Sequence, residues 1–222
     1  MYNNPPHTEA ELQQRVDKIA NSSIAMVAQQ CNLAVPENLQ HNKGWIGQLL
    51  EKALYTSASN LSEPDFLELG IELKSIPVKS NGYPAETTYI CQVPLINNLG
   101  QQWQQSCVAR KLNKVLWIPI QSDSNISLAQ RLVGQGIIWQ PTESQLDLIK
   151  DDWEELMEYV AFGQIDQIDA SYGEVLQIRP KAANSKARTV GVNEKGQYNN
   201  TMPRGFYLRT AFTAQIIRDN EK

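Results

Sequence analysis

The sequence is poor in histidine and cysteine, and each shortage argues against a class of protein. Only two of the 222 residues are histidines, His7 and His41, so a histidine-rich metal site or a nuclease with a histidine base is poorly supplied. The three cysteines, Cys31, Cys91 and Cys107, are odd in number and form no CxxC pair, which favours reduced core thiols over disulfides or a zinc site. Chemistry must therefore use carboxylates and lysines.

Long apolar runs are also missing. No segment approaches the roughly 20 uninterrupted apolar residues that a bilayer span requires. The first residues, MYNNPPHTEAE, lack the basic start and apolar stretch of a secretory signal. We therefore expect a cytoplasmic protein without a membrane partner, and the 41% of hydrophobic residues is ample for a buried core.

Charge is unevenly distributed along the chain. The net charge of −4 at first argues against nucleic acid as a partner. Residues 1–170 carry 11 Lys and Arg against 20 Asp and Glu, a net of −9, whereas residues 171–222 carry 9 against 4, a net of +5. The carboxyl-terminal segment is thus suited to hold a polyanion, although a solvated surface explains such an asymmetry equally well.

The order of elements predicts a mixed α/β fold in a single domain, 1–222, with no repeat and no linker. Thr8 and Glu11 form a capping-box pattern that opens a helix over about 8–20, and an apolar stripe predicts another helix over 44–54. Thr142 and Gln145 repeat the capping-box pattern at the start of an acidic helix.

Strands are expected where β-branched and apolar residues cluster. IELKSIPV at 71–78 predicts a strand, with TTYICQVPL from Thr87 as its neighbour and LNKVLWIPI from Leu112 as a third. GEVLQIRP at 173–180 predicts a further strand, followed by a polar loop over 181–200. FYLRTAFTAQII at 206–217 predicts a closing helix.

One segment carries a pattern that suits metal-dependent phosphodiester hydrolysis. After Pro64 come Asp65, Glu72 and Lys74, in the form P-D…E-x-K. Side chains alternate along a strand, so Glu72 and Lys74 should share one face about 7 Å apart, with Leu73 on the other. Asp65, Glu72 and the backbone carbonyl of Leu73 would offer the hard oxygen ligands that Mg²⁺ prefers, and Lys74 would orient a water.

Plainer interpretations of the same residues remain open. Asp65 could cap a turn, while Glu72 and Lys74 form an ion pair on a solvated strand face, worth ~0–1 kcal/mol. Against this, two charges inside an apolar run are costly unless an ion or a partner compensates them. Glu51 is a candidate further ligand or water holder, or an exposed helix glutamate, and Lys111 is a weaker candidate still.

Six blocks closely resemble the MutH family of mismatch-repair endonucleases: KGWIGQLLE (43–51), PDFLELGIELKSIPV (64–78), KVLWIPI (114–120), DDWEELM (151–157), LQIRPKAANSKA (176–187) and PRGFYLR (203–209). The resemblance implies a restriction-endonuclease-like mixed sheet flanked by helices, with two lobes forming a DNA-binding cleft. The catalytic lobe would lie mainly in 20–120 and the DNA-reading lobe mainly in 121–222.

The resemblance also implies an activity. It is the Mg²⁺-dependent nicking of the unmethylated strand at hemimethylated or unmethylated GATC sites in double-stranded DNA. The bacterial enzyme would act as a monomer in the cytoplasm. MutL would stimulate it directly, and MutS would act indirectly by finding the mismatch.

Roles for single residues follow from the matching positions. The resemblance makes Asp65, Glu72 and Lys74 the metal-binding and catalytic set, supported by Glu51 and Lys111. The positions that would contact DNA are Lys43, Arg179, Pro180, Lys181 and Tyr207. Arginine suits bidentate recognition of guanine, and a phenol beside an adenine can sense its methylation. Alternatively, Arg179 and Lys181 contact only phosphates, and Tyr207 is a core aromatic at a helix start.

Two other functions compete with the nickase. A restriction endonuclease would cut both strands of GATC with the same residues, but it needs a dimer or a second nuclease-like half. A catalytically silent module would bind DNA or MutL, using the acidic segment from Asp147 to Glu158 as a protein interface. The intact set of Asp65, Glu72 and Lys74 argues against the silent module.

Overall fold

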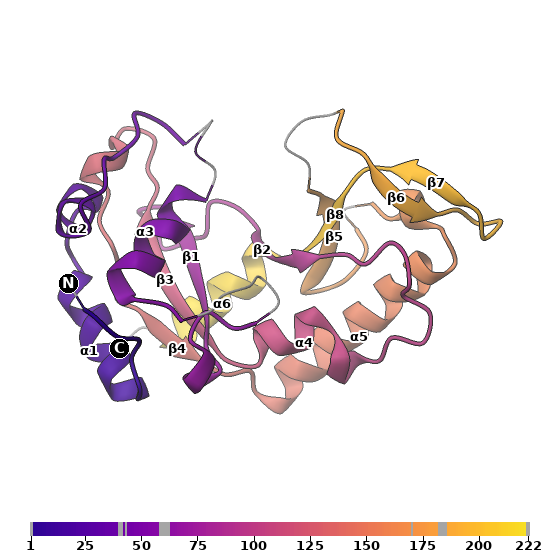
Figure 1. Cartoon of the computed structure of the whole chain (residues 1–222), viewed down its shortest axis with the longest axis horizontal. Coiled ribbons are helices and arrows are strands. Elements are labelled where there is room, and N and C mark those ends of the chain that lie inside the picture. The colour runs from indigo at the N-terminus through magenta and orange to yellow at the C-terminus, as the bar shows by residue number, and fades with distance from the viewer. Residues whose placement is uncertain are drawn as a thin grey trace. The chain divides into compact units, whose positions relative to one another are not determined.

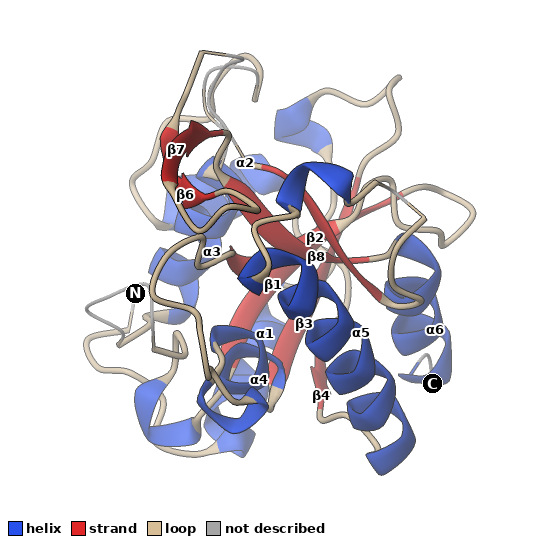
Figure 2. Cartoon of the chain, turned by 90° about the vertical axis from the view of Figure 1, so that its right-hand side faces the viewer, coloured by secondary structure: helices blue, strands red, loops and turns tan. Residues whose placement is uncertain are grey.

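The computed structural model describes residues 2–39, 42, 44–57, 63–169, 171–181 and 186–220. The fold is mixed α/β, as predicted, with helices and several sheets (Figures 1 and 2). The chain divides into two compact units. Unit 1 comprises Met1–Glu86, Asn113–Gln140 and Ala214–Lys222, and unit 2 comprises Thr87–Leu112 and Pro141–Thr213. Each unit is therefore built from segments distant in sequence.

The sheet of unit 1 carries the P-D…E-x-K segment. Within the described residues its strands are β1 (Glu72–Val78), β3 (Val115–Gln121) and β4 (Ile137–Trp139), in the order β1-β3-β4. β1 runs parallel to β3 with Leu73 opposite Leu116, and β4 runs antiparallel to β3. The strand predicted over 71–78 is thus confirmed, but its neighbour is β3 and not the strand that begins near Thr87.

Three helices cover one face of this sheet (Figure 1). They are α1 (Glu9–Ile19), α2 (Ile24–Gln30) and α3 (Trp45–Leu54). Their apolar sides meet the inward-facing residues of β1 and β3 in one core cluster, which includes Leu12, Val16, Val27, Leu49, Leu50, Leu73, Leu116 and Ile118. Burial of this apolar surface is the main favourable term that holds β1 in place.

The two helix starts predicted from the capping-box patterns are confirmed. Thr8 caps α1 by accepting the backbone N–H of Glu11 at 3.1 Å, although the Glu11 carboxylate accepts the N–H of His7 rather than that of Thr8. At α5 (Glu143–Ala161) the capping box is complete, with both the Thr142 and the Gln145 side chains engaged.

The outer edge of β1, away from β3, is bonded at two points by the chain's own loops. The N–H of Glu72 points toward β3, where it donates to the carbonyl of Lys114, so the N–H of Leu73 points the other way. There it donates to the Asp65 carboxylate at 2.8 Å. Further along this edge the Pro77 carbonyl accepts the N–H of Ala85 at 2.8 Å.

Unit 2 contains a second sheet, ordered β2-β8-β5 within the described residues. β2 (Thr88–Gln92) and β5 (Leu176–Pro180) both pair antiparallel with β8 (Arg204–Leu208). α4 (Cys107–Leu112) contacts β2, and α5 contacts β5. The short 3-10 helices of the described chain are Leu67–Leu69, Trp103–Gln105, Leu128–Gln130 and Ile165–Gln167.

Two sequence predictions in this region are wrong. The segment 206–217 is not one helix: β8 continues to Leu208, and α6 (Thr210–Asn220) begins only at Thr210. The polar loop over 181–200 contains β6 (Thr189–Val192), which pairs with β7 (Tyr198–Thr201). The first error arose because β8 is defined by main-chain pairing with the distant strands β2 and β5. The second arose because the polar composition of 181–200 suggested a loop, although β6 and β7 form a local hairpin there.

In the part of the chain that the structure describes, no helix is both long and apolar enough to cross a membrane. Cys31 and Cys91 are buried and Cys107 is partly buried, and none of the three forms a disulfide. Cys31 and Cys91 thus match the expectation of core thiols, whereas Cys107 does not lie in the core.

Candidate active site and a tyrosine-lined sheet face

Glu72 and Lys74 lie on the same face of β1, as the alternation of the strand predicts. The Lys74 ammonium Nζ lies 2.5 Å from Glu72 Oε1. The side chains are only 2% and 16% exposed, so the pair is not on a solvated face. Leu73 points to the opposite side, into the core with α1, α2 and α3.

A tight turn returns Asp65 to this end of β1. Phe66 and Ile71 pair across the turn, and Gly70 takes a left-handed conformation with φ 63°, which favours glycine. Asp65 Oδ2 consequently accepts the N–H of Leu73, the residue between Glu72 and Lys74. Because N–H and C=O of one residue point to the same edge of a strand, the Leu73 carbonyl faces the Asp65 side.

The turn is held by Ser57, which the sequence patterns did not single out. The Ser57 N–H donates to the Asp65 carbonyl at 2.9 Å, and its hydroxyl accepts the N–H of Leu67 at 3.0 Å. Ser57 follows α3 closely, and α3 packs against β1. The helix and the turn are therefore fixed relative to β1 within unit 1.

The structure gives weaker support to the other candidate site residues, Glu51, Lys111 and Lys43. Glu51 is an exposed residue of α3, as the plainer interpretation expected, and its carbonyl accepts the N–H of Thr56 at the helix end. Lys111 is 7% exposed in the last turn of α4 and belongs to unit 2. Lys43 lies outside the described residues.

The donor set of unit 1 suits a hard cation. Asp65, Glu72 and the Leu73 carbonyl present oxygen, and the chain has few of the nitrogen and sulfur groups that softer metals select. Among the described residues, no group of three or more His, Cys, Asp and Glu could hold a metal ion by itself. A bound ion would thus complete its shell with water or substrate oxygens, as Mg²⁺ commonly does.

The turn that bears Asp65 also contacts the amino-terminal segment. His7 Nδ1 lies 2.7 Å from Glu68 Oε2, and both side chains are largely exposed. The hydrogen bond that the His7 ring donates to the Glu68 carboxylate is the main cause that raises the pKa of His7 above its usual value. The folded state therefore favours the imidazolium, and this contribution to stability is lost as pH rises through the raised pKa of the folded state.

An NMR titration of the His7 ring should give a midpoint above about 6.5, its ordinary value. Glu68→Gln should lower that midpoint because the carboxylate no longer stabilises the imidazolium. Glu37→Gln, at another exposed glutamate, serves as the control and should leave the midpoint unchanged. An equal midpoint in all three proteins would disprove the contact.

Three of the predicted DNA-contacting residues of unit 2, Arg179, Lys181 and Tyr207, lie on one face of the β2-β8-β5 sheet. Residues directly opposite in antiparallel strands share a face, and Arg179 is opposite Gly205 while Tyr207 is opposite both Gln177 and Tyr89. We call the surface formed by Tyr89, Arg179, Lys181 and Tyr207 the tyrosine face. Phe206 and Leu208 are buried on the opposite side of β8.

Neighbouring groups orient the cations of the tyrosine face. The Arg179 guanidinium donates to the Thr87 hydroxyl at 2.9 Å, and Arg179 is exposed at the end of β5. Pro180 is exposed and ends the strand, and the N–H of Lys181 extends the pairing by donating to the Pro203 carbonyl at 2.8 Å. Tyr207 therefore lies in a strand, not at a helix start.

Tyr89 is a member of this face that the sequence patterns missed. Lys181 Nζ lies 3.9 Å from the centre of the Tyr89 ring, which packs edge-on against Tyr207 at 5.4 Å between centroids. Burial raises the pKa of Tyr89 to about 12, which moves ionisation of the phenol still further above physiological pH. No local signal indicates these contacts, because the partners belong to distant segments.

Gly205 makes room for both rings. A Cβ at this position would lie 2.8 Å from Tyr89 Cε2 and 3.1 Å from Tyr207 Cε2. Gly205→Ala should therefore displace the rings and lower stability by roughly 1–3 kcal/mol, although alanine normally suits a strand better than glycine. Thermal unfolding and the ring resonances of the two tyrosines would measure both effects.

Gly47→Ala provides the matched control, because its nearest atom would be 4.0 Å away and its helix should gain roughly 1 kcal/mol from alanine. If Gly205→Ala left the melting temperature and the tyrosine resonances as in the wild type, the crowding at Gly205 would be refuted.

Taken together, the α/β scaffold and the buried carboxylate–lysine pair beside a second carboxylate are the features of a nuclease-like enzyme. Residues 54–152 match the family described as "DNA mismatch repair enzyme MutH". A protein of Histophilus somni strain 2336, named DNA mismatch repair protein MutH, is 51% identical over 215 residues, covering 97% of this chain and 96% of that protein.

Relatives of the same name occur in other bacteria. The Vibrio vulnificus strain YJ016 protein is 52% identical over 214 residues, covering 96% of this chain and 94% of its own length. The Shewanella baltica strain OS185 protein is 48% identical over 213 residues, covering 96% of both chains. The chain belongs to the MutH family of DNA mismatch repair enzymes.

Proposed function

We propose that the protein is a Mg²⁺-dependent endonuclease that nicks the unmethylated strand of hemimethylated or unmethylated GATC sites during mismatch repair. The observation that carries the proposal is the buried pair of Glu72 and Lys74, with Asp65 bonded to the residue between them. Family membership supplies the repair context.

The metal site of the proposal consists of Asp65, Glu72 and the carbonyl of Leu73. When bound, Mg²⁺ would neutralise charge that grows on the phosphate and lower the pKa of a coordinated water. The N–H of Leu73 and the turn at Gly70 hold the Asp65 carboxylate in position. Glu51 and Lys111 are proposed as supporting residues.

Lys74 would act on the attacking water and on the phosphate. Its ammonium is oriented by Glu72 and is largely shielded from solvent, so its charge is less screened than that of a surface lysine. A fixed cation in such a place can hold a water by hydrogen bonding and balance negative charge in the transition state. Those two roles suit hydrolysis of a phosphodiester.

The tyrosine face is proposed to select the DNA sequence. Arg179 can donate two hydrogen bonds to a guanine edge, and Lys181 and Lys43 can contact phosphates. Tyr207, beside the neutral Tyr89, is proposed to lie near the adenine whose methylation is sensed. Pro180 would shape the strand end that carries Arg179.

The remaining parts of the proposal concern partners and location. The enzyme is proposed to act as a monomer in the bacterial cytoplasm, stimulated by MutL after MutS has found a mismatch. The DNA-binding cleft, with lobes mainly over 20–120 and 121–222, stays a prediction from the family resemblance.

A nicking assay tests the proposal directly. Supercoiled plasmids with unmethylated, hemimethylated or fully methylated GATC would be incubated with the full chain and Mg²⁺, with and without MutL. We expect nicks in the first two substrates, none in the third, strong stimulation by MutL, and no cleavage after chelation of the metal.

Other patterns would support the competing functions. Double-strand breaks at GATC by a dimeric protein would indicate a restriction endonuclease. Specific binding of GATC or MutL without cleavage, at any Mg²⁺ concentration, would indicate a non-catalytic module. Equal nicking of all three substrates would remove methylation sensing from the proposal.

A further inference from the structure

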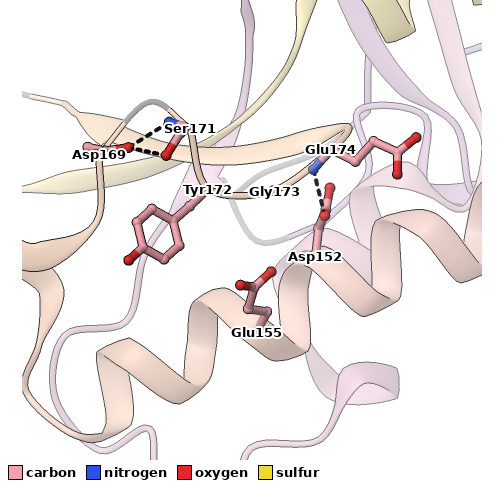
Figure 3. A pocket seen from close by; sticks show the side chains of 7 residues that line it. All are labelled: Asp152, Glu155, Asp169, Ser171, Tyr172, Gly173 and Glu174. Carbon is pink, nitrogen blue, oxygen red and sulfur yellow. Dashed lines mark hydrogen bonds between the residues drawn. The ribbon is translucent and has the colours of Figure 1, made fainter.

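A buried carboxylate from α5 holds the start of β5. Asp152 is 7% exposed, and its Oδ1 accepts the N–H of Glu174 at 2.8 Å (Figure 3). Its Oδ2 accepts the N–H groups of Val175 and Leu176, each at 2.7 Å. Three charge-assisted bonds from one carboxylate satisfy successive backbone donors and tie the strand to the helix.

A guanidinium holds the same turn from the β8 side. Arg209, the residue after β8, donates through Nε to the Gly173 carbonyl at 3.0 Å and through a terminal nitrogen to the Tyr172 carbonyl at 2.8 Å. Its backbone N–H donates to the Val175 carbonyl at 2.9 Å. The turn over 172–176 is therefore bonded to both of the elements that flank it.

Gly173 allows the turn to close this tightly. Its φ of 76° lies in the left-handed region, and a Cβ would lie 1.9 Å from the Leu176 carbonyl oxygen and 3.3 Å from Asp152 Cγ. No other residue fits there without moving the backbone. The turn thus has one geometry, set by Asp152 and Arg209.

The cavity beside the turn does not suggest a ligand for Asp152. It has a volume of about 510 Å³, and its lining includes Tyr172 and the four acidic residues Asp152, Glu155, Asp169 and Glu174 (Figure 3). The negative charge of this lining would repel DNA. Both Asp152 oxygens are engaged by backbone donors. The carboxylate therefore acts on the chain itself.

What the turn fixes is the register of β5 against β8. Leu176, held by Asp152, is opposite Leu208, next to Arg209, and the same register continues to Arg179 opposite Gly205. A slip by one residue would exchange the faces of β5, moving Arg179 from the tyrosine face to the buried side.

We propose that Asp152 and Arg209 are positioning residues for DNA sequence selection, acting through the β5–β8 register that places Arg179 beside Tyr207. The inference rests on the proposed role of the tyrosine face in DNA recognition. Neither residue needs to touch DNA or the scissile phosphate.

Asp152→Asn tests the proposal with little change in size. An amide has one acceptor oxygen, and its NH₂ group would face backbone N–H donors that the carboxylate now accepts. Nicking with Mg²⁺ alone, on GATC and on a site with one substituted base pair, should show roughly tenfold weaker discrimination, the value of one lost base contact. The loss of discrimination should appear mainly as a change in KM.

Asp151→Asn is the matched control, since Asp151 is the exposed neighbour on α5. It should discriminate as the wild type does. Arg209→Lys disturbs the turn without touching the buried carboxylate and should repeat the effect of Asp152→Asn. Amide NMR spectra without DNA should show shifts at Arg179, Gly205 and Tyr207 in both variants, and none in the control.

The outcomes separate this inference from the proposed function. If the wild type itself fails to select GATC, the proposed function fails, and so does the proposed effect of Asp152 and Arg209 on DNA recognition. In that case the amide NMR spectra still decide whether the turn over 172–176 sets the β5–β8 register. Folded variants with unchanged spectra and discrimination would overturn the inference. So would an equal loss of rate on both sites together with a lower melting temperature, which indicates a structural support alone.

Discussion

Lys74→Ala is expected to abolish nicking while DNA affinity stays close to that of the wild type. The substitution removes the ammonium that lies 2.5 Å from Glu72 Oε1, and with it the fixed positive charge of the proposed site. Loss of a preorganised group of this kind lowers kcat by roughly 10²–10³-fold or more. Single-turnover nicking of a GATC duplex measures the rate, and fluorescence anisotropy in the presence of Ca²⁺ measures binding.

Lys79→Ala is the matched control, because Lys79 is an exposed lysine one residue beyond β1. It should nick at the wild-type rate. Thermal unfolding of both variants separates a catalytic defect from a loss of fold, since the partner Glu72 is buried. A folded Lys74→Ala protein that still nicks would remove Lys74 from the mechanism.

Arg179→Ala should relax the choice of GATC more than it weakens overall binding. The guanidinium is held by the Thr87 hydroxyl at the exposed end of β5, so it is oriented before DNA arrives. A bidentate contact to guanine provides roughly 1–3 kcal/mol of discrimination, or about 5- to 150-fold. The ratio of kcat/KM for GATC and for sites with one substituted base pair measures this loss.

Arg218→Ala removes the same charge from the last turn of α6 and should preserve the ratio. A uniform loss of affinity for every sequence in Arg179→Ala, with a smaller salt dependence, would instead identify Arg179 as a phosphate contact. Unchanged affinity and discrimination would exclude it from the interface.

Sequence patterns were most informative where local rules determine the structure. The alternation of a strand correctly placed Glu72 and Lys74 on one face with Leu73 in the core, and the Thr142–Gln145 box correctly marked the start of α5. These features depend on residues within a few positions of each other. The burial of the charged pair was not predictable from them, because it depends on what packs over that face.

The errors at Tyr207 and Tyr89 concern pairings between distant segments, whereas the missed β6–β7 hairpin is local. Tyr207 was expected near a helix start, but pairing of β8 with both β2 and β5 keeps Tyr207 in a strand. Tyr89 was overlooked because its contacts with Lys181 and Tyr207 are visible only once β2 and β8 are adjacent. The chemistry of the site followed from the residues, whereas GATC and methylation sensing come from the family resemblance.

The bonds at the outer edge of β1 should also hinder aggregation. An uncovered strand edge is a template on which other chains add as further strands. Pro77 offers no N–H there, its carbonyl is taken by Ala85, and the N–H of Leu73 is taken by Asp65. The bond that holds the Asp65 carboxylate at the proposed metal site also occupies a donor on this edge. Loss of Asp65 should therefore expose a strand edge with which another chain can pair, and so promote aggregation.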